Sequence, residues 1–185
     1  MSEEIIVKHC SPTLAGLKTA SLFSCEFSDK SELDDFLKKN NKLLAKKGVR
    51  MIPLRRSDKS ALVYVYRPEL LDRDLSDHDA ADILARLGYS DTRPNHCLTR
   101  LRERLCGGEF PHEIGCFLGY PPEDVNGFID NRAKGCKLVG CWKVYGNVER
   151  AKTLFEKYKK CTDVYCRCYK NGRPIDELCV KRSIG

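Results

Sequence analysis

The order of apolar and polar positions along the chain predicts a mixture of strands and helices. Ile5-Ile6-Val7 is a β-branched run, typical of a buried strand over residues 4–9. Ser11 and Pro12 then fit the N-cap and first position of a helix, whose apolar face would include Leu14, Leu17 and Leu22-Phe23. The chain is therefore expected to begin with a strand followed directly by a helix.

Two capping boxes predict the starts of further helices. Ser31 with Asp34 opens a helix that Gly48 would end, and Ser76 with Asp79 opens one that Gly88 would end. Apolar spacing predicts other helices over residues 94–106, 111–118, 122–131 and 148–159. A short helix is also expected in the tail, after Pro174.

The remaining apolar segments predict strands. Residues 49–54 and 61–66 flank a polar turn and form a hairpin, while residues 137–145, and less clearly 164–169, read as strands. The irregular order predicts an α+β fold with a mixed or antiparallel sheet of roughly four or five strands and about seven helices. That sheet would contain residues 4–9, 49–55, 61–66 and 137–145. We expect one domain over residues 1–160, with a Cys-rich extension over 161–185 packed on it.

Composition and charge narrow the class of protein. The 185-residue chain is 42% hydrophobic and 32% charged, a balance typical of a globular domain. It has no apolar run near the ~20 residues that span a bilayer, and its acidic start does not fit a secretory signal. The net charge of +7 comes without a long basic block or aromatic–basic repeat. We expect a cytoplasmic protein that binds neither membrane nor nucleic acid; its oligomeric state is left open.

Cysteine is unusually frequent, with 11 residues in the chain. An odd number without an export signal predicts mostly free thiols and at most one structural disulfide. At least half of these cysteines are expected to pack as small apolar residues. The others are candidates for redox chemistry or metal binding.

Cys10 is the first candidate for chemistry. A thiol between a strand end and a helix N-terminus meets unpaired N–H groups and the positive end of the helix dipole, which favour the thiolate. His9 lies beside it, and Lys18 could add positive charge. The same N–H groups, with Ser11 and Thr13, could instead hold an anionic ligand. The alternative is that Cys10 simply packs in the core.

The segment 110–121 is the second candidate. His112-Glu113 resembles the start of a metalloprotease helix, but Cys116 stands where that motif has its second His, so a metalloprotease of this type is excluded. His112 and Cys116 could share a helix face and a metal ion. Equally, His112 could cap the helix, and the nearby glycines and aromatic residues favour tight packing. Tyr120 would contribute to a ligand site.

Cys161, Cys166 and Cys168 are the third candidate. Thiolates at such spacings can bind zinc or an iron–sulfur cluster, so iron and zinc are the cofactors to consider. The chain nevertheless contains no C-x-x-C. It also lacks G-x-S-x-G, P-loop and G-x-G-x-x-G motifs, which argues against serine hydrolases and the common nucleotide-binding folds.

Several segments together resemble an uncharacterised family found in anaerobic bacteria, the domain-of-unknown-function family 3793. They are His-Cys-Ser-Pro-Thr-Leu-Ala-Gly-Leu-Lys at 9–18, Leu-Val-Tyr-Val-Tyr-Arg at 62–67, Phe-Pro-His-Glu-Ile-Gly at 110–115, Gly-Tyr-Pro at 119–121, Asp-Val at 124–125, Gly-Phe-Ile at 127–129 and Trp-Lys-Val-Tyr at 142–145. The resemblance covers about residues 5–160. It implies a free-standing, cytoplasmic, single-domain protein and supplies no activity. It directs attention to the polar residues of its signature: His9, Cys10, Lys18, Arg67, His112 and Glu113.

These observations leave three functions open. The first is an enzyme with Cys10 as nucleophile or redox thiol, acting on a small anionic or redox-active substrate. His9 or His112 would be its base, Glu113 would orient the base, and Lys18 or Arg67 would bind the substrate. The second is a protein that binds a metal or metal cofactor through His and Cys, in iron or redox homeostasis. The third is an interaction module without chemistry.

Overall fold

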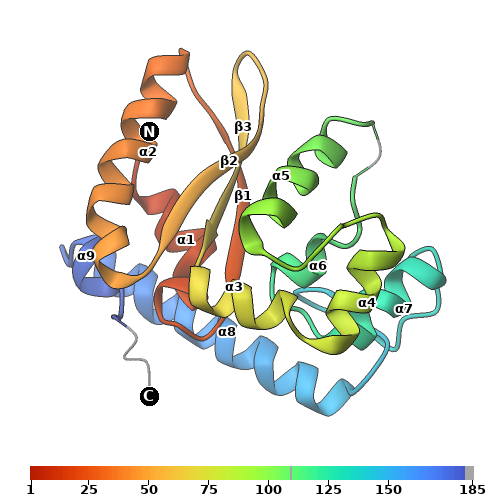
Figure 1. Ribbon diagram of the computed structural model, residues 1–185. Coiled ribbons are helices and arrows are strands. Elements are labelled where there is room, and N and C mark those ends of the chain that lie inside the picture. Colours follow the sequence, from red (N-terminus) through yellow and green to blue (C-terminus); the bar gives the residue numbers. More distant parts are fainter. Residues whose placement is uncertain (109, 182–185) are drawn as a thin grey trace. The chain divides into compact units, whose positions relative to one another are not determined.

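The computed structural model describes residues 1–108 and 110–181 and divides the chain into two compact units (Figure 1). The first unit contains Met1–Glu69 and Lys160–Gly185, and the second contains Leu70–Lys159. Together they confirm the mixed α+β class. The expectation of one domain over residues 1–160 with an extension over 161–185 stays a prediction. No helix in the described ranges is both long and apolar enough to cross a bilayer.

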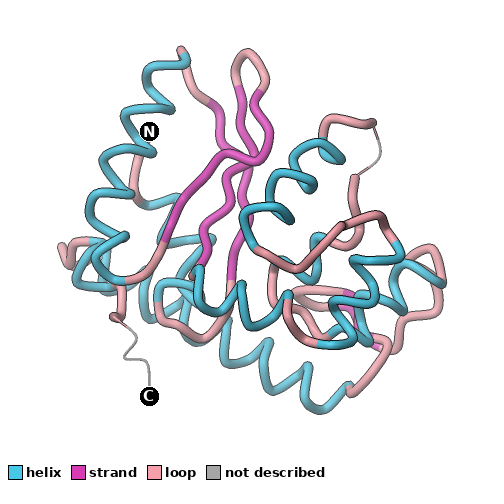
Figure 2. The backbone as a smooth tube through the Cα atoms, in the orientation of Figure 1, coloured by secondary structure: helices cyan, strands magenta, loops and turns pink. Residues whose placement is uncertain are grey.

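A three-stranded antiparallel sheet forms the centre of the first unit (Figure 2). Its strands β1 (Ala20–Glu26), β2 (Arg50–Arg56) and β3 (Ser60–Tyr66) lie in the order β1-β3-β2. The predicted hairpin is confirmed as the β2–β3 pair. Pro53 cannot donate to a strand ladder, and it lies on the edge strand β2, where the register shifts before Arg55.

Helices pack against this sheet and close the core of the first unit. Helix α1 (Glu4–Leu14) packs on β1 and β3, and α2 (Lys30–Leu44) packs on β2. The single turn η1 (Ala45–Lys47) follows α2 and ends at Gly48, which has a left-handed φ of 73° as a helix terminator. Asp29, rather than Ser31, caps α2, because its carboxylate accepts from the Glu32 N–H at 3.0 Å.

The C-terminal segment completes the same core. The second half of α8 (Val148–Lys170) and the short α9 (Ile175–Leu178) belong to it, and Ile175, Leu178 and Cys179 are buried in the core cluster. The Val180 N–H donates to the Leu14 carbonyl at 3.0 Å. The predicted tail helix is confirmed as α9, whereas the predicted strand 164–169 is wrong because α8 continues to Lys170.

The predicted strand over residues 4–9 is also wrong. Ile6, Cys10 and Leu14 are spaced by four and all face the core, so the segment is the helix α1. Pro12 is not its first residue but lies in its last turn, where it removes the N–H that would otherwise bond to the Lys8 carbonyl. There the Ser11 hydroxyl donates to the Val7 carbonyl.

The helix predicted to begin at Pro12 and to include Leu22 and Phe23 is a second error, because those two residues lie in strand β1. Phe23 and Cys25 are buried while Ser24 and Glu26 are exposed, which is the alternation of a strand with one face on the core. The chain turns at Gly16, whose φ is 71°, and β1 then pairs along its whole length with the central strand β3.

The second unit is mainly helical. It holds most of α3 (Pro68–Leu75), the helices α4 (His78–Arg86), α5 (Pro94–Leu105), α6 (Ile114–Phe117) and α7 (Pro122–Asp130), and the first half of α8. Asp77 caps α4, one residue later than predicted. The predicted strand 137–145 is a small hairpin of β4 (Leu138–Val139) and β5 (Lys143–Val144). Since the two sheets belong to different units, the single sheet of four or five strands is wrong.

A candidate ligand-binding pocket

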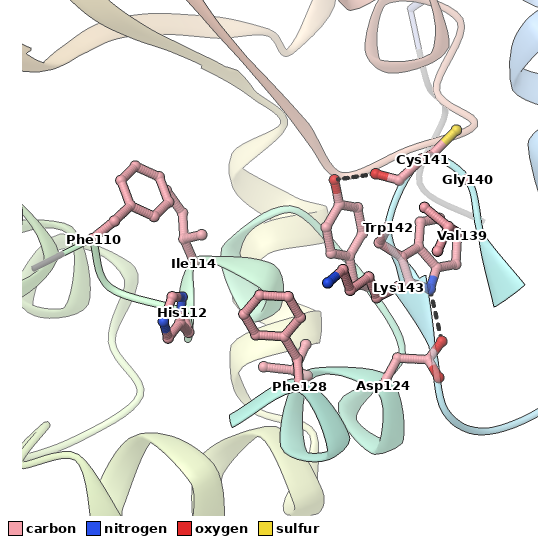
Figure 3. Close-up of a pocket in the computed structure, with 12 residues that line it drawn as sticks. Phe110, His112, Ile114, Asp124, Phe128, Val139, Gly140, Cys141, Trp142 and Lys143 are labelled. Atoms are coloured by element: carbon pink, nitrogen blue, oxygen red, sulfur yellow. Dashed lines mark hydrogen bonds between the residues drawn. The ribbon is translucent and has the colours of Figure 1, made fainter. Parts of the chain in front are cut away.

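The second unit contains a cavity of about 380 Å³, the aromatic pocket (Figure 3). Three stretches of chain contribute to it: the approach to α6, the turn into α7 with α7 itself, and the β4–β5 hairpin. Its lining is mostly apolar and aromatic. The residues are Phe110, His112, Ile114, Tyr120, Asp124, Val125, Phe128, Val139, Gly140, Cys141, Trp142 and Lys143.

Asp124, in the first turn of α7, holds two sides of the pocket together. Its buried carboxylate accepts from the Trp142 indole N–H at 2.7 Å and from the backbone N–H groups of Tyr145 and Gly146 at 2.7 and 2.8 Å. A buried carboxylate is stable only when its lone pairs are used in this way. Asp124 therefore fixes the hairpin on α7 and sets the orientation of Trp142.

Aromatic rings form one wall of the aromatic pocket. The Tyr120 ring stacks on Trp142 with centroids 4.7 Å apart, and Phe155 of α8 meets Trp142 edge-on at 4.5 Å. Gly140 allows this packing, because a Cβ there would lie 2.1 Å from Cε2 of Phe155. Burial raises the pKa of Tyr120 to about 12, so its phenol is neutral at physiological pH.

His112 and Phe110 lie on the opposite side of the cavity, with Phe128 between the two sides (Figure 3). The His112 imidazole is exposed and meets the edge of the Phe128 ring at 4.9 Å. Phe110 remains 46% exposed, which is unusual for so large an apolar side chain. The aromatic pocket is therefore open to solvent at this side.

Lys143 is the cation of the aromatic pocket. Its half-buried ammonium donates to the Ala133 carbonyl at 2.8 Å and lies 5.8 Å from the centroid of Phe128. Within residues 1–108 and 110–181, no carboxylate forms an ion pair with it. An ammonium has three N–H donors, and the Ala133 carbonyl takes one.

Glu113, predicted to orient a catalytic His112, bonds to Tyr89 and Arg104 in the structure. Its buried carboxylate accepts from the Tyr89 hydroxyl at 2.9 Å and from the Arg104 guanidinium. Burial, with the nearby Glu113 carboxylate, raises the pKa of Tyr89. The same two causes raise the pKa of Cys116 to about 12. This cluster holds α5 against the start of α6 and keeps Cys116 a neutral thiol.

Cys10 does not have the surroundings that its predicted reactivity requires. It lies in the interior of α1 with no exposed surface, rather than at a helix N-terminus. Burial raises its pKa far above the ordinary value of a thiol, although Lys18 and the Ser21 hydroxyl act in the opposite direction. A thiol that stays protonated and buried is a poor nucleophile.

The other residues predicted around Cys10 serve the fold of the first unit. The Thr13 and Ser21 hydroxyls are 2.9 Å apart and hydrogen-bonded, and the buried Ser11 hydroxyl bonds within α1. His9 points away from Cys10 by helix geometry and stacks on Phe23 at 6.0 Å. Its pKa is lowered by partial burial and by Lys8.

Arg67, predicted to bind an anion, is buried, and its guanidinium donates hydrogen bonds to backbone carbonyl groups. It donates to Thr13 at 2.7 Å, Leu14 at 2.7 Å, Val180 at 2.8 Å and Lys47 at 3.3 Å. These carbonyls come from α1, η1 and the C-terminal segment. Arg67 thus joins three distant parts of the chain.

The predicted metal candidates Cys161, Cys166 and Cys168 lie on α8, and each is partly buried. In the described part of the chain, no three His, Cys, Asp or Glu side chains form a group that could hold a metal ion. Every one of the 11 cysteines is a free thiol. Nothing in this geometry favours iron or zinc at these positions.

Of the predicted site residues, only His112 and Tyr120 line the aromatic pocket, and Lys143, Trp142 and Phe128 were missed. All three lie in segments that resemble family 3793. The sequence-based prediction took only polar residues with familiar catalytic chemistry from those segments. A usable signal was the concentration of aromatic residues: Phe110, Phe117, Tyr120, Phe128, Trp142 and Tyr145 lie within 36 positions, 110–145.

A family model described as "Protein of unknown function (DUF3793)" matches residues 6–179, nearly the whole chain. The match confirms the resemblance drawn from the sequence. It extends through the C-terminal cysteines, beyond the region that the motifs cover. No curated protein and no solved structure matches the chain.

Proposed function

The chain belongs to the DUF3793 family, whose description assigns no activity, and we propose from the aromatic pocket that it binds a small ring-containing molecule. The observation that carries this proposal is a cavity of about 380 Å³ lined by four aromatic side chains, Phe110, Tyr120, Phe128 and Trp142, and by the imidazole of His112. Ligand cavities of roughly 300–1,000 Å³ with apolar walls and few polar groups are the usual sites for small molecules.

The wall chemistry favours a planar, largely apolar ligand. Phe128, Tyr120 and Trp142 offer ring faces and edges for stacking, which adds to the effect of apolar burial. Because Asp124 already orients Trp142, the wall is formed before a ligand arrives. The phenol of Tyr120 is neutral at physiological pH, so it adds no charge to the wall.

Trp142 provides a direct test, because it is the only tryptophan in the chain. N-phenyl-1-naphthylamine is a neutral apolar dye that accepts energy from tryptophan and brightens in apolar sites. We expect saturable dye binding with quenching of the Trp142 emission and transfer to the dye. Saturable binding without transfer would place the dye elsewhere and contradict the proposal.

A matched pair of substitutions locates the binding. Val139 lines the aromatic pocket and is 67% exposed, whereas Val164 lies on α8 outside it and is 43% exposed. Both can accept Asp with little cost to folding. Val139→Asp is expected to weaken dye binding about tenfold, and Val164→Asp to leave it unchanged. Equal effects of the two would contradict the proposal.

Two of the three functions considered from the sequence, the thiol enzyme and the metal-binding protein, have less support. A thiol enzyme at Cys10 would need a solvent-accessible thiolate, and burial disfavours both properties. A His and Cys metal protein would need ligands gathered at one point, and the described residues offer no such group. A cytoplasmic location, where thiols stay reduced, suits the free cysteines and remains part of this proposal.

A further inference from the structure

We infer that the ligand of the aromatic pocket is an organic anion, whose charged group binds the ammonium of Lys143 while its ring lies against Phe128 and Trp142. This inference rests on the proposed function and narrows it to one class of ligand. Aromatic carboxylates, sulfonates and phosphates share the chemistry required: a flat apolar body and a compact anion that accepts hydrogen bonds.

The position of Lys143 supports this assignment. Figure 3 shows its ammonium above the Phe128 ring, directed toward the side of His112 rather than outward from the hairpin. Because the ammonium is half-buried, an anion that reaches it interacts at lower dielectric than on an open surface. The N–H donors not used by the Ala133 carbonyl are available to such a group.

The loop that holds Lys143 is itself basic and strained. Arg132 and Ala133 have left-handed φ angles of 49° and 62°, which non-glycine residues adopt at a cost. This conformation presents the Ala133 carbonyl to Lys143 and places Arg132 and Lys134 beside that contact in the chain. The Arg132 and Lys134 side chains are exposed and Asp130 lies two positions before Arg132, so the positive charge that lines the aromatic pocket is that of Lys143.

The acidic residue of the aromatic pocket does not cancel this charge at the ligand position. The Asp124 carboxylate is held by three N–H donors and lies beside the Trp142 indole, away from the Lys143 ammonium (Figure 3). Rings alone would also attract organic cations through their faces. Here the Lys143 ammonium already occupies the region over Phe128, and it would repel a second cation.

Two dyes with the same ring skeleton separate this inference from the proposed function. 1-Anilinonaphthalene-8-sulfonate carries a sulfonate that N-phenyl-1-naphthylamine lacks. The measurement is the Kd of each dye, from energy transfer from Trp142, for the unmodified protein and for Lys143→Met. We expect Lys143→Met to raise the Kd of the sulfonate about tenfold and to change that of the neutral dye less than twofold.

Two further variants control for charge and position. Lys143→Arg keeps the positive charge and should retain most of the affinity for the sulfonate. Lys137→Met removes a lysine of the same hairpin region, whose ammonium donates to the Gly146 carbonyl at 3.2 Å and lies outside the pocket lining. It should change the Kd of either dye less than twofold. Unfolding midpoints verify that all variants fold.

The outcomes distinguish the two claims. If neither dye quenches Trp142, the proposed function fails and this inference fails with it. If both dyes bind and Lys143→Met changes both Kd values equally, or neither, the aromatic pocket stands and the anion assignment is overturned. A Lys143→Met effect confined to the sulfonate, lost at high salt, supports the assignment.

Discussion

The two units use their buried polar groups in different ways. In the first unit, the Arg67 guanidinium is directed at backbone carbonyls of α1, η1 and the C-terminal segment. In the second, the Lys143 ammonium has one backbone acceptor and faces a cavity. Arg67 is 3% exposed, whereas Lys143 is only half-buried.

This contrast shows how a structural cation differs from one that can bind a ligand. A guanidinium whose donors meet carbonyls from three segments is required by the fold, and a ligand would have to displace those carbonyls. An ammonium beside an open apolar cavity can gain an anion without such a loss. The same reasoning separates Glu113, held by Tyr89 and Arg104, from the exposed His112 next to it.

The largest effect is expected from Arg67→Met. The substitution leaves buried carbonyls of α1 and the C-terminal segment without their charged donor, and each such loss is costly. We expect the free energy of unfolding to fall by about 3 kcal/mol or more, measured by urea denaturation. Arg55→Met, on the exposed end of β2, is the control and should change it by less than about 0.5 kcal/mol. Similar losses for both variants would contradict the structural role of Arg67.

A smaller loss, confined to the second unit, is expected from Gly140→Ala. Its new Cβ would lie 2.1 Å from the Phe155 ring, which must then shift and disturb the edge-on contact with Trp142. We expect a loss of about 2 kcal/mol from overpacking, together with a red shift of the Trp142 emission. Gly135→Ala is the control: it has open space but a φ of 68°, and should cost about 1 kcal/mol without a spectral change. An unchanged Trp142 emission in Gly140→Ala would show that this contact does not shape the aromatic pocket.

Local signals in the sequence were sufficient for some elements and misleading for others. The β2–β3 hairpin and α5 were predicted because apolar period and turn residues agree there with the tertiary packing. Helix α1 was missed because three β-branched residues suggested a strand, while the spacing of Ile6, Cys10 and Leu14 already suggested a helix. Burial against β1 and β3 decides between the two, and that is not a local property.

The candidate site was predictable only in part, for a related reason. His112 and Tyr120 were selected because their chemistry is familiar, and both line the aromatic pocket. Lys143 gains its significance from the Ala133 carbonyl and the Phe128 ring, which are 10 and 15 positions away in the chain. The cavity itself depends on how α6, α7 and the β4–β5 hairpin pack together. No spacing rule within one segment could reveal it.

The smallest effect concerns the pH dependence of stability and tests the interior position of Cys10. Burial raises the pKa of this thiol in the folded protein above its value in the unfolded chain, which is about 8.5. Below that pH the thiol is protonated in both states, and its contribution is fully present. As the pH rises further, only the unfolded state releases the proton, so the free energy of unfolding should fall by about 1.4 kcal/mol per pH unit from this group. The measurement is urea denaturation between pH 7 and pH 9.5, over which the fall from this group amounts to about 1.4 kcal/mol in total. Cys10→Ala should show a shallower decline by that amount, whereas Cys106→Ala, at an exposed thiol, should keep the slope of the unmodified protein. If Cys10→Ala also keeps that slope, the thiol ionises in the folded state, and the reactive Cys10 that the sequence first suggested returns as the better interpretation.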